Sequence, residues 1–296
     1  MQSPLRTALA GALLVAQAAL AVPTADGERL FHVATRRKLT LAEALKDLRK
    51  ARVVFLGEAH DNRAHHEAQL KVIRALHEAG VPLAVGLEMF RSSAQEQLDR
   101  WAGGGLSEEE FYDVYAQHWN FGWWPVYAPI FRYARDKRIP LIGLNVPQEL
   151  VTQVARRGFE SLSAPQREEL GVLRCDVDPR YQELMAALTG TPDRQAPHFQ
   201  RFCQAQLVWD TAMAKRLAEY AERNPRRALV VLAGTFHAWK HGVPEQLERR
   251  APLPYRVILP AEDEAVVRYE ILSDDADYLW LHPPRVPATP APARPR

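Results

Sequence analysis

The sequence predicts an α/β fold: a mostly parallel sheet with helices on both faces and a helical insertion subdomain beside it. The first observation is a set of short apolar runs, such as VVFL at 53–56, without the alternation of a half-exposed strand. The second is that helical patterns separate these runs, which is the order of a parallel sheet with right-handed crossovers. The third is the stretch 147–222, which is helical in pattern and too long for a single crossover.

Local signals predict each element. Thr40-Leu-Ala-Glu43 is a capping box that opens a short helix, and Ser107 with Glu110 forms a second box. Gly80, with Pro82 just beyond, ends the helix that begins near residue 62. Strands are expected at 52–56, 83–87, 140–144, 228–233, 257–260 and 265–271. Helices are expected at 62–79, 93–102, 107–117 and 125–137, with a long one at 198–222.

Both ends of the chain are predicted to lie outside the fold. Residues 1–21 are typical of a secretory signal peptide, with Arg6, an apolar run and small residues before cleavage at Ala21. The run is shorter than the roughly 20 apolar residues of a membrane span, and an uncleaved N-terminal anchor is the alternative. Residues 283–296 contain six prolines and are expected to form a disordered, solvated tail. One α/β domain is therefore expected over 22–282.

This interpretation makes the protein exported, either periplasmic or secreted. No cysteine lies near the signal, so a lipoprotein is not expected. Nucleic acid is not an expected partner, because the net charge is 38 − 36 = +2 and no basic stripe with interleaved aromatics occurs. The two cysteines, Cys175 and Cys203, either pair in an oxidising compartment or remain separately buried thiols.

Polar residues follow each of the four main strands. Because parallel strands end at one edge of a sheet, and ligands bind outside that edge, these residues are expected to share a site. Two of the apolar runs, at 53–56 and 230–233, are each followed by a Gly-x-x-His unit, and Gly57 and Gly234 are interpreted as allowing a sharp turn. The strand-end residues are Glu58, His60 and Asp61, then Glu88, Asn145 and His237.

Other candidates have strong structural alternatives. Asp61 could simply cap the next helix, and a single histidine could bond a loop carbonyl. His66 lies in the first turn after the strand and shares a face with apolar residues. In the long helix, Gln206 and Asp210 interrupt an apolar stripe that is otherwise typical of a core. His66, Gln206 and Asp210 are therefore predicted as supporting residues of the site.

With these residues located, the chain resembles the ChaN-like haem-binding uptake proteins of the Tiki superfamily over roughly residues 35–260. The resemblance depends on LGEAHDNRAHHEAQ, GLEMF, WNFGWWPVYAPI, LNVPQELV, QAQLVWDTAMAK and LAGTFHAWKHGVPEQL, in that order. It implies an α/β core with a helical insertion, and an exported protein that binds haem in iron or haem acquisition. In the wider superfamily, which is similar to erythromycin esterases and Tiki proteases, the Gly-x-x-His and glutamate positions serve hydrolysis.

The chain departs from the family pattern in two ways. It lacks the lipobox cysteine that many bacterial members carry, which puts outer-membrane anchoring in doubt. It also has Phe236 where many members have a second glycine, which could narrow the space around His237.

Haem binding is the first functional hypothesis. Haem needs an axial ligand, a wide apolar slot and cations for its propionates. The expected partners are haem or another small molecule, a second copy of the chain, and components of membrane transport. The sequence does not single out the axial ligand, for which the candidates are Tyr127, Tyr181, His118 and His198, whereas Lys240, His241 or Arg201 would meet the propionates.

The second hypothesis is a metal-dependent hydrolase of peptidase or esterase type. His60 and His237 would hold a divalent ion with Glu58 or Glu88, and the remaining carboxylate would activate water. The usual His-Glu-x-x-His signature of metalloproteases is missing. A third alternative is an exported partner-binding protein whose strand-end site is vestigial.

Overall fold

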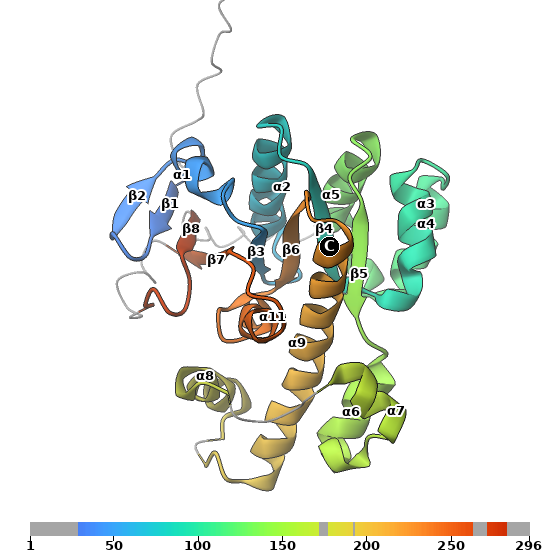
Figure 1. Cartoon of the computed structure of the whole chain (residues 1–296), viewed down its shortest axis with the longest axis vertical. Helices are drawn as coiled ribbons and strands as arrows, with labels where there is room; N and C mark the ends of the chain where they lie inside the picture. Colours follow the sequence, from blue (N-terminus) through green and yellow to red (C-terminus); the bar gives the residue numbers. More distant parts are fainter. Residues whose placement is uncertain (1–28, 172–176, 192, 263–270, 283–296) are drawn as a thin grey trace, which may run out of the picture.

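The computed structural model of the chain describes residues 29–171, 177–191, 193–262 and 271–282. They form one eight-stranded sheet in the order β2-β1-β8-β7-β3-β6-β4-β5 (Figure 1). All neighbours from β8 to β5 pair in parallel, whereas β1 pairs antiparallel with both β2 and β8. The strands are β1 (Arg29–His32), β2 (Arg37–Leu39), β3 (Val53–Glu58), β4 (Leu83–Arg91), β5 (Leu141–Asn145), β6 (Ala228–Gly234), β7 (Tyr255–Glu262) and β8 (Tyr278–His282).

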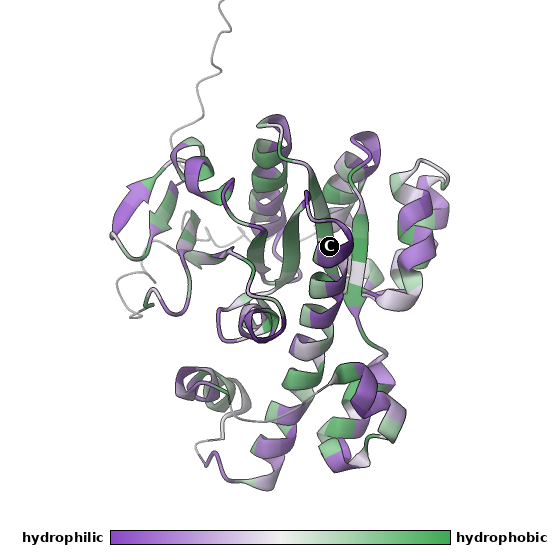
Figure 2. Ribbon diagram, in the orientation of Figure 1, coloured by the Kyte–Doolittle hydropathy of each residue, from purple (hydrophilic) through white to green (hydrophobic). Residues whose placement is uncertain are grey.

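Helices cover both faces of the sheet, which confirms the predicted fold class. One face packs on α1 (Leu41–Leu48), α2 (Arg63–Glu78), α3 (Gln95–Ala102), α4 (Glu108–His118) and α5 (Trp124–Asp136). The other face packs on the second half of α9 (Pro197–Arg223) and on α10 (Thr235–Ala238) and α11 (Val243–Arg250). In β3, Val54 and Leu56 point to the first face, while Val53 and Phe55 point to the second. Because both faces are covered, β3 is apolar without alternation, and the central strands are uniformly hydrophobic in Figure 2.

The stretch 147–222 forms the predicted helical subdomain at the carboxyl ends of the strands (Figure 1). It contains α6 (Gln148–Arg157), α7 (Ala164–Leu170), α8 (Pro179–Thr189) and the first half of α9. Two small apolar clusters hold it together. Val154, Leu170 and Val208 belong to the cluster under α6 and α7, and Tyr181 and Phe199 to the cluster under α8. Helix α9 therefore joins the subdomain to the sheet.

Both predicted capping boxes are present, at Thr40 with Glu43 and at Ser107 with Glu110. Three short 3₁₀ turns, Ser92–Ala94, Phe121–Trp123 and Phe159–Ser161, complete the described elements. Within the described residues, no helix is both long and apolar enough to span a bilayer.

The sequence did not predict β1, β2 and β8. β1 and β2 are short, and β2 is almost fully exposed, so neither carries a long apolar run. β8 does carry the apolar run YLWL, so its sequence offered a signal that was not used. The strand expected at 265–271 falls almost wholly outside the described residues, as do the predicted signal segment and the proline-rich tail. Cys203 is disulfide-bonded, which excludes a free thiol at this position, while Cys175 lies outside the described residues.

Candidate functional site

The carboxyl edge of the sheet brings together the polar residues of three adjacent strands. Glu58 ends β3 and is paired in register with Gly234, the last residue of β6. Helix α10 follows β6 at once and carries His237. Glu88 lies on β4, on the other side of β6. The predicted convergence at this edge is therefore present, with His60 in the loop after β3.

Glu58 is the buried acceptor of a dense hydrogen-bond network. Its Oε1 accepts from the hydroxyl of Tyr127 and from Nδ1 of His60, at 2.9 Å from the latter. Its Oε2 accepts from Nε2 of Gln69 at 2.8 Å and lies 3.4 Å from Nδ1 of His66. Burial raises the pKa of this carboxyl, but the His60 hydrogen bond and the nearby histidines outweigh it, so the pKa is lowered overall. Glu58 is thus held as a carboxylate.

His60 is the exposed member of this network. Its side chain is 30% exposed, while the Glu58 side chain is fully buried. The ring packs against two indoles, with centroids 5.0 Å from Trp119 and 5.5 Å from Trp123, and these indoles contact each other at 6.1 Å. Burial lowers its pKa, but the hydrogen bond to Glu58 and the charge of Glu88 raise it overall. Because Nδ1 faces a carboxylate, neutral His60 carries its proton there and leaves a lone pair on Nε2.

His237 belongs to a second carboxylate–histidine pair. Its Nδ1 lies 2.6 Å from Oδ1 of Asp210, whose Oδ2 accepts from the hydroxyl of Tyr181 at 2.8 Å. Asp210 and Tyr181 are fully buried and the His237 side chain is only 10% exposed. Burial lowers the pKa of His237, but the charges of Asp210 and Glu88 raise it to about 9. His237 is therefore a buried cation at neutral pH.

Glu88 lies between the two pairs. Its Oε2 accepts from the backbone N–H of Gly234 at 2.6 Å, and its Oε1 lies 3.8 Å from Nε2 of His237. A Cβ on Gly234 would lie 3.1 Å from Cε1 of His60, so the glycine makes room for that imidazole. The sharp-turn interpretation is wrong for Gly57, which lies within β3, whereas Gly234 does stand where β6 turns directly into α10, without a positive φ. Close approach explains Gly234.

Two of the supporting residues, His66 and Asn145, form hydrogen bonds within the site, whereas Asp61 and Gln206 only lie near it in the sequence or the fold. His66 is buried and its ring nitrogens contact Oε1 of Gln69 and the carbonyl of His60, each at 3.0 Å, so it supports the Glu58 network. Asn145 donates to the carbonyl of Glu88 at 2.8 Å and joins β5 to β4. Asp61 is exposed, and the neighbouring Asn62 caps α2 instead. Gln206 is buried on α9, one turn before Asp210.

The structure does not present either predicted tyrosine to a ligand. Tyr127 and Tyr181 are fully buried and donate to Glu58 and Asp210. Burial and these carboxylates raise both phenol pKa values, which opposes the tyrosinate that iron would need. His118 is half-buried, and its Nδ1 accepts from the N–H of Arg91 at 3.4 Å. Burial and Arg91 lower its pKa, so neutral His118 carries its proton on Nε2.

The predicted propionate partners lie elsewhere. Lys240 donates to the carbonyl of Ser273 and to Asp277, at 2.7 and 2.8 Å. Nε2 of His241 lies 3.4 Å from the buried Asp275. Lys240 and His241 line a polar cleft of about 540 Å³ between α8 and α11. His198, a further candidate for the axial ligand, has its Nε2 at 2.9 Å from Oγ1 of Thr191. These residues do not join the strand-end network.

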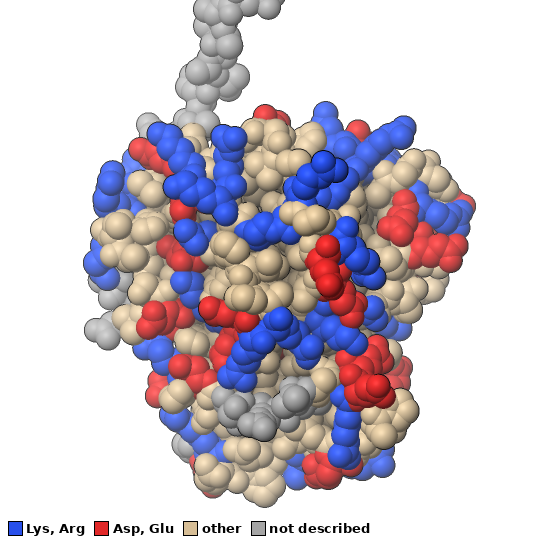
Figure 3. Space-filling view, viewed as in Figure 1, with Lys and Arg blue, Asp and Glu red and all other residues tan. Residues whose placement is uncertain are grey.

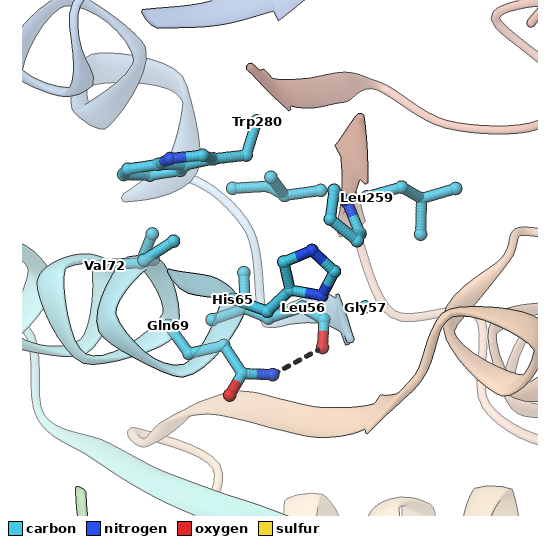
Figure 4. A pocket seen from close by; sticks show the side chains of 10 residues that line it. Leu56, Gly57, His65, Gln69, Val72, Leu259 and Trp280 are labelled. Carbon is cyan, nitrogen blue, oxygen red and sulfur yellow. Dashed lines mark hydrogen bonds between the residues drawn. The ribbon is translucent and has the colours of Figure 1, made fainter. Parts of the chain in front are cut away.

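A small cavity behind the Glu58 network is enclosed by Leu56, Gly57, His65, Gln69 and Trp280 (Figure 4). Its volume is about 20 Å³, which is about the size of one water molecule and far below that of any cofactor. Figure 4 also shows Gln69 donating to the carbonyl of Leu56, at 3.2 Å, in addition to Glu58. The cavity is a packing defect next to the site, whereas Nε2 of His60 faces the β6 side, where a Cβ on Gly234 would lie 3.4 Å from it.

The sequence missed three features of the site. Gln69 orients Glu58 from α2, one turn after His66. Trp119 and Trp123 contact His60 from the WNFGWW segment; core packing or a wall for a flat ligand were both open for this segment, but its contact with His60 was not predicted. The spacing of Gln69 from His66 was a usable signal, whereas the approach of the two indoles to His60 depends on packing across the fold. Among the described residues, no group of three or more histidine, cysteine, aspartate or glutamate side chains is arranged to hold a metal ion.

Comparison with known proteins identifies a family and a close fold. A family model described as "Haem-binding uptake, Tiki superfamily, ChaN" matches residues 44–247. ChaN of Campylobacter jejuni, described as binding haem cofacially, has a TM-score of 0.68 at 18% identity, covering 87% of this chain and 97% of that chain. An erythromycin esterase in its open conformation has a TM-score of 0.46 at 18% identity, covering 78% and 76% of the two chains.

Among curated proteins, the chain is 26% identical over 258 residues to Protein RETICULATA-RELATED 5, chloroplastic, of Arabidopsis thaliana. The match covers 79% of this chain and 34% of that protein, so the chain spans about a third of the length of its curated relative.

Proposed function

Since the chain belongs to the ChaN family of haem-binding uptake proteins in the Tiki superfamily, we propose that it binds haem and that the imidazole of His60 ligates the iron. The observation that carries the proposal is the state of this ring. His60 is 30% exposed, its Nδ1 is held by the buried Glu58 carboxylate, and its Nε2 is left as the lone-pair nitrogen. A carboxylate behind a ligating histidine fixes the ring and makes it a stronger ligand.

The surroundings of His60 fit a flat, amphipathic ligand. Trp119 and Trp123 flank the ring, and Phe121 between them is 65% exposed. The Nε1–H of Trp119 is buried without an acceptor in the described part of the chain, so it could donate to a ligand oxygen. Arg91, at the end of β4, forms no ion pair within the described residues and would meet a propionate. When bound, haem supplies the iron, and the protein supplies its ligand and apolar walls.

The histidines differ in their suitability as ligands. His118 keeps its proton on Nε2 because Nδ1 accepts a backbone N–H, so its outer nitrogen has no free lone pair. His237 is charged at neutral pH and nearly closed to solvent. Tyr127 and Tyr181 serve as hydrogen-bond donors to buried carboxylates. His60 is therefore the ligand that the geometry favours.

A haem titration of the purified protein, followed by absorbance, tests this proposal. We expect a saturable Soret shift at one haem per chain or fewer. In His60→Ala the haem affinity should fall by about 30- to 100-fold, because the iron loses its protein ligand. His118→Ala, a nearby and half-buried histidine, is the matched control and should bind almost normally. Non-saturating absorbance in the wild type would mean adsorption only, and the proposal would be abandoned.

The cellular role is part of the same proposal. We infer export, through the apolar segment of residues 8–22, and a role in iron or haem acquisition outside the cytoplasm. The disulfide at Cys203 supports an oxidising compartment, where such bonds persist. A second copy of the chain and membrane transport components stay as proposed partners. Intact-mass measurement of periplasmic material tests export, and a mass that still includes Met1 would contradict cleavage.

Hydrolysis is the second candidate function, and the position of Glu88 favours it. Its carboxylate raises the pKa of both His60 and His237, so the three ionisable groups act on one another at a single edge. Cationic His237 can act as an acid toward a leaving group, while neutral His60 can activate water. We derive no metal-dependent step, because the described residues do not form a metal site.

Activity toward p-nitrophenyl acetate tests the hydrolytic alternative. If the edge is catalytic, His60→Ala and His237→Ala should each reduce kcat/KM by about 100-fold or more. Turnover by the wild type no faster than that of both variants would dismiss it and leave haem binding unaffected.

A further inference from the structure

The amino-terminal edge of the sheet, opposite the candidate site, carries a concentration of positive charge. The cations lie in the turns that lead into three of the parallel strands, β3, β6 and β5. We call this set the basic rim; it consists of Arg49, Lys50, Arg52, Lys137, Arg138, Arg223, Arg226 and Arg227. Lys and Arg predominate over the upper end of the molecule in Figure 3, where the turns into β3 and β6 lie in Figure 1. The charge therefore lies at one end.

The side chains of the basic rim have no carboxylate within ion-pair distance among the described residues. None of its eight side chains forms an ion pair with a carboxylate in the parts of the chain that the structure describes. Elsewhere many basic side chains are paired, as Arg132 is with Glu108 and Arg256 with Asp47. Arg52 instead donates to the carbonyl of Arg227 at 2.7 Å, which fixes these two turns together. A guanidinium has five N–H donors, so Arg52 keeps several for a ligand.

A groove of about 690 Å³ between α9 and α11 opens at the rim. Its apolar lining comes from Ala218, Ala221, Pro225, Ala251 and Leu253, and its charged lining from Arg52, Lys215, Arg250, Glu219 and Glu222.

Some of the charged side chains at the groove form ion pairs with each other, and others do not. Lys215 and Arg216 both pair with Glu219, at 3.7 and 3.4 Å, which leaves Glu222 as the exposed acid. Arg250 donates to the carbonyl of Leu170, forms no ion pair in the described residues, and has its pKa lowered by burial. Arg52 and Arg250 thus present guanidinium groups without an ion-pair partner in the described residues, beside an apolar wall, which is the chemistry that a phosphate on a hydrocarbon chain requires.

We propose that the basic rim and this groove dock the protein on an anionic phospholipid surface, where Arg52 and Arg250 each offer a guanidinium group to lipid phosphates along the groove. Lys and Arg side chains near an anionic membrane each add to the attraction, so the eight cations of the rim favour salt-sensitive, reversible binding. Nucleic acid is less favoured because the rim and groove contain no aromatic side chain on which a base could stack. The candidate site, at the opposite edge of the sheet, would then face away from the membrane. The inference does not depend on haem binding.

Co-sedimentation with vesicles tests the proposal on the full described domain. Vesicles of phosphatidylcholine with about 30% phosphatidylglycerol should bind at least tenfold more protein than phosphatidylcholine alone, and salt near 0.5 M should release it. Arg223→Glu with Arg226→Glu should abolish binding. The matched control is Arg156→Glu with Arg157→Glu, which makes the same change of charge on exposed α6 residues at the other end.

A second comparison tests the groove. Arg250→Gln should weaken binding several-fold, whereas Arg249→Gln should not, because Arg249 is already paired with Glu245. Thermal melting verifies that each variant is folded. Equal binding to neutral and anionic vesicles, or equal loss in the rim and α6 variants, would overturn the proposal. Rim-dependent binding to a single-stranded oligonucleotide, without binding to vesicles, would overturn it in favour of nucleic acid.

Discussion

The two Gly-x-x-His units begin alike and end in different environments. They follow neighbouring strands, with Glu58 in register with Gly234, and each histidine has its Nδ1 next to a buried carboxylate. Yet the His60 side chain is 30% exposed and that of His237 only 10%. The shared pattern therefore specifies an oriented histidine, and the surrounding structure decides whether that histidine can meet a ligand.

Packing over each unit explains the difference. His60 lies in the loop between β3 and α2 and is flanked by two indoles, which leave one side of the ring open. His237 lies on α10 against Trp209 and Phe236, and Asp210 and Tyr181 close it from the helical subdomain. The helical subdomain thus buries His237 beside Asp210, whereas it leaves the similar His60 motif partly exposed.

Removing the carboxylate behind the open histidine should have the largest effect. Glu58→Ala leaves Tyr127, Gln69 and His60 without their buried acceptor, so we expect a loss of about 3–5 kcal/mol in the free energy of unfolding. Urea denaturation measures it. Glu67→Ala, an exposed change on α2, is the control and should stay within about 0.5 kcal/mol of the wild type. Equal stability of the two variants would show that the network does not hold the site together.

The closed histidine should dominate the alkaline side of the stability profile. Since the folded pKa of His237 is raised to about 9, its contribution is fully present below the unfolded value near 6.5 and is lost as pH rises through about 9. The loss should be on the order of 3 kcal/mol. Urea denaturation at several pH values should show this decline in the wild type and a flatter curve in His237→Gln. Parallel curves would contradict the assignment of a buried imidazolium.

Removing the tyrosine hydroxyl from each carboxylate–histidine pair should lower stability in both cases but change the haem spectrum in only one. Tyr181→Phe removes one hydrogen bond to Asp210, and Tyr127→Phe removes one to Glu58, so each should cost about 1–2 kcal/mol in thermal or urea unfolding. Only Tyr127→Phe should also change the haem spectrum, because its partner carboxylate orients the proposed ligand. An identical spectral change in both variants would place the haem between the two pairs instead.

The smallest effect is a pH dependence of haem affinity. Protons compete with iron for Nε2 of His60, whose pKa is raised, so affinity should fall by up to about tenfold per pH unit below that pKa. Glu58→Gln removes the main group that raises it, and the decline should then begin at a lower pH. Titrations from pH 5 to about 8 measure this. A pH-independent affinity in the wild type would argue against a histidine ligand.

The sequence could predict those parts of the site that depend on residues close together along the chain. Glu58, His60, Glu88 and His237 were found because each lies on, or just beyond, an apolar strand, and parallel strands share an edge. The roles of Tyr127 and Tyr181 were not, because each depends on a contact across more than 25 residues of chain, to Glu58 and Asp210 (sequence separations of 69 and 29).

The same distinction applies to the fold. The central strands carry apolar runs and were predicted to within a few residues, although β4 extends beyond its predicted end to Arg91. The edge strand β2 and its neighbour β1 are stabilised by pairing rather than by a long apolar run, so their short sequences gave no signal. The basic rim was also missed, because its cations come from three separate turns that only the sheet brings together.

Chemical rescue of the proposed ligand tests the central claim most directly. His60→Gly removes the imidazole, and free imidazole can enter the space left beside Trp119 and Trp123. Electron paramagnetic resonance and absorbance of the ferric haem complex report the axial ligand. We predict that the variant loses the wild-type histidine signature and that millimolar imidazole restores it, whereas His237→Gly keeps that signature without imidazole. A His60→Gly variant that binds haem with unchanged affinity and spectrum would contradict the assignment of His60 as the iron ligand.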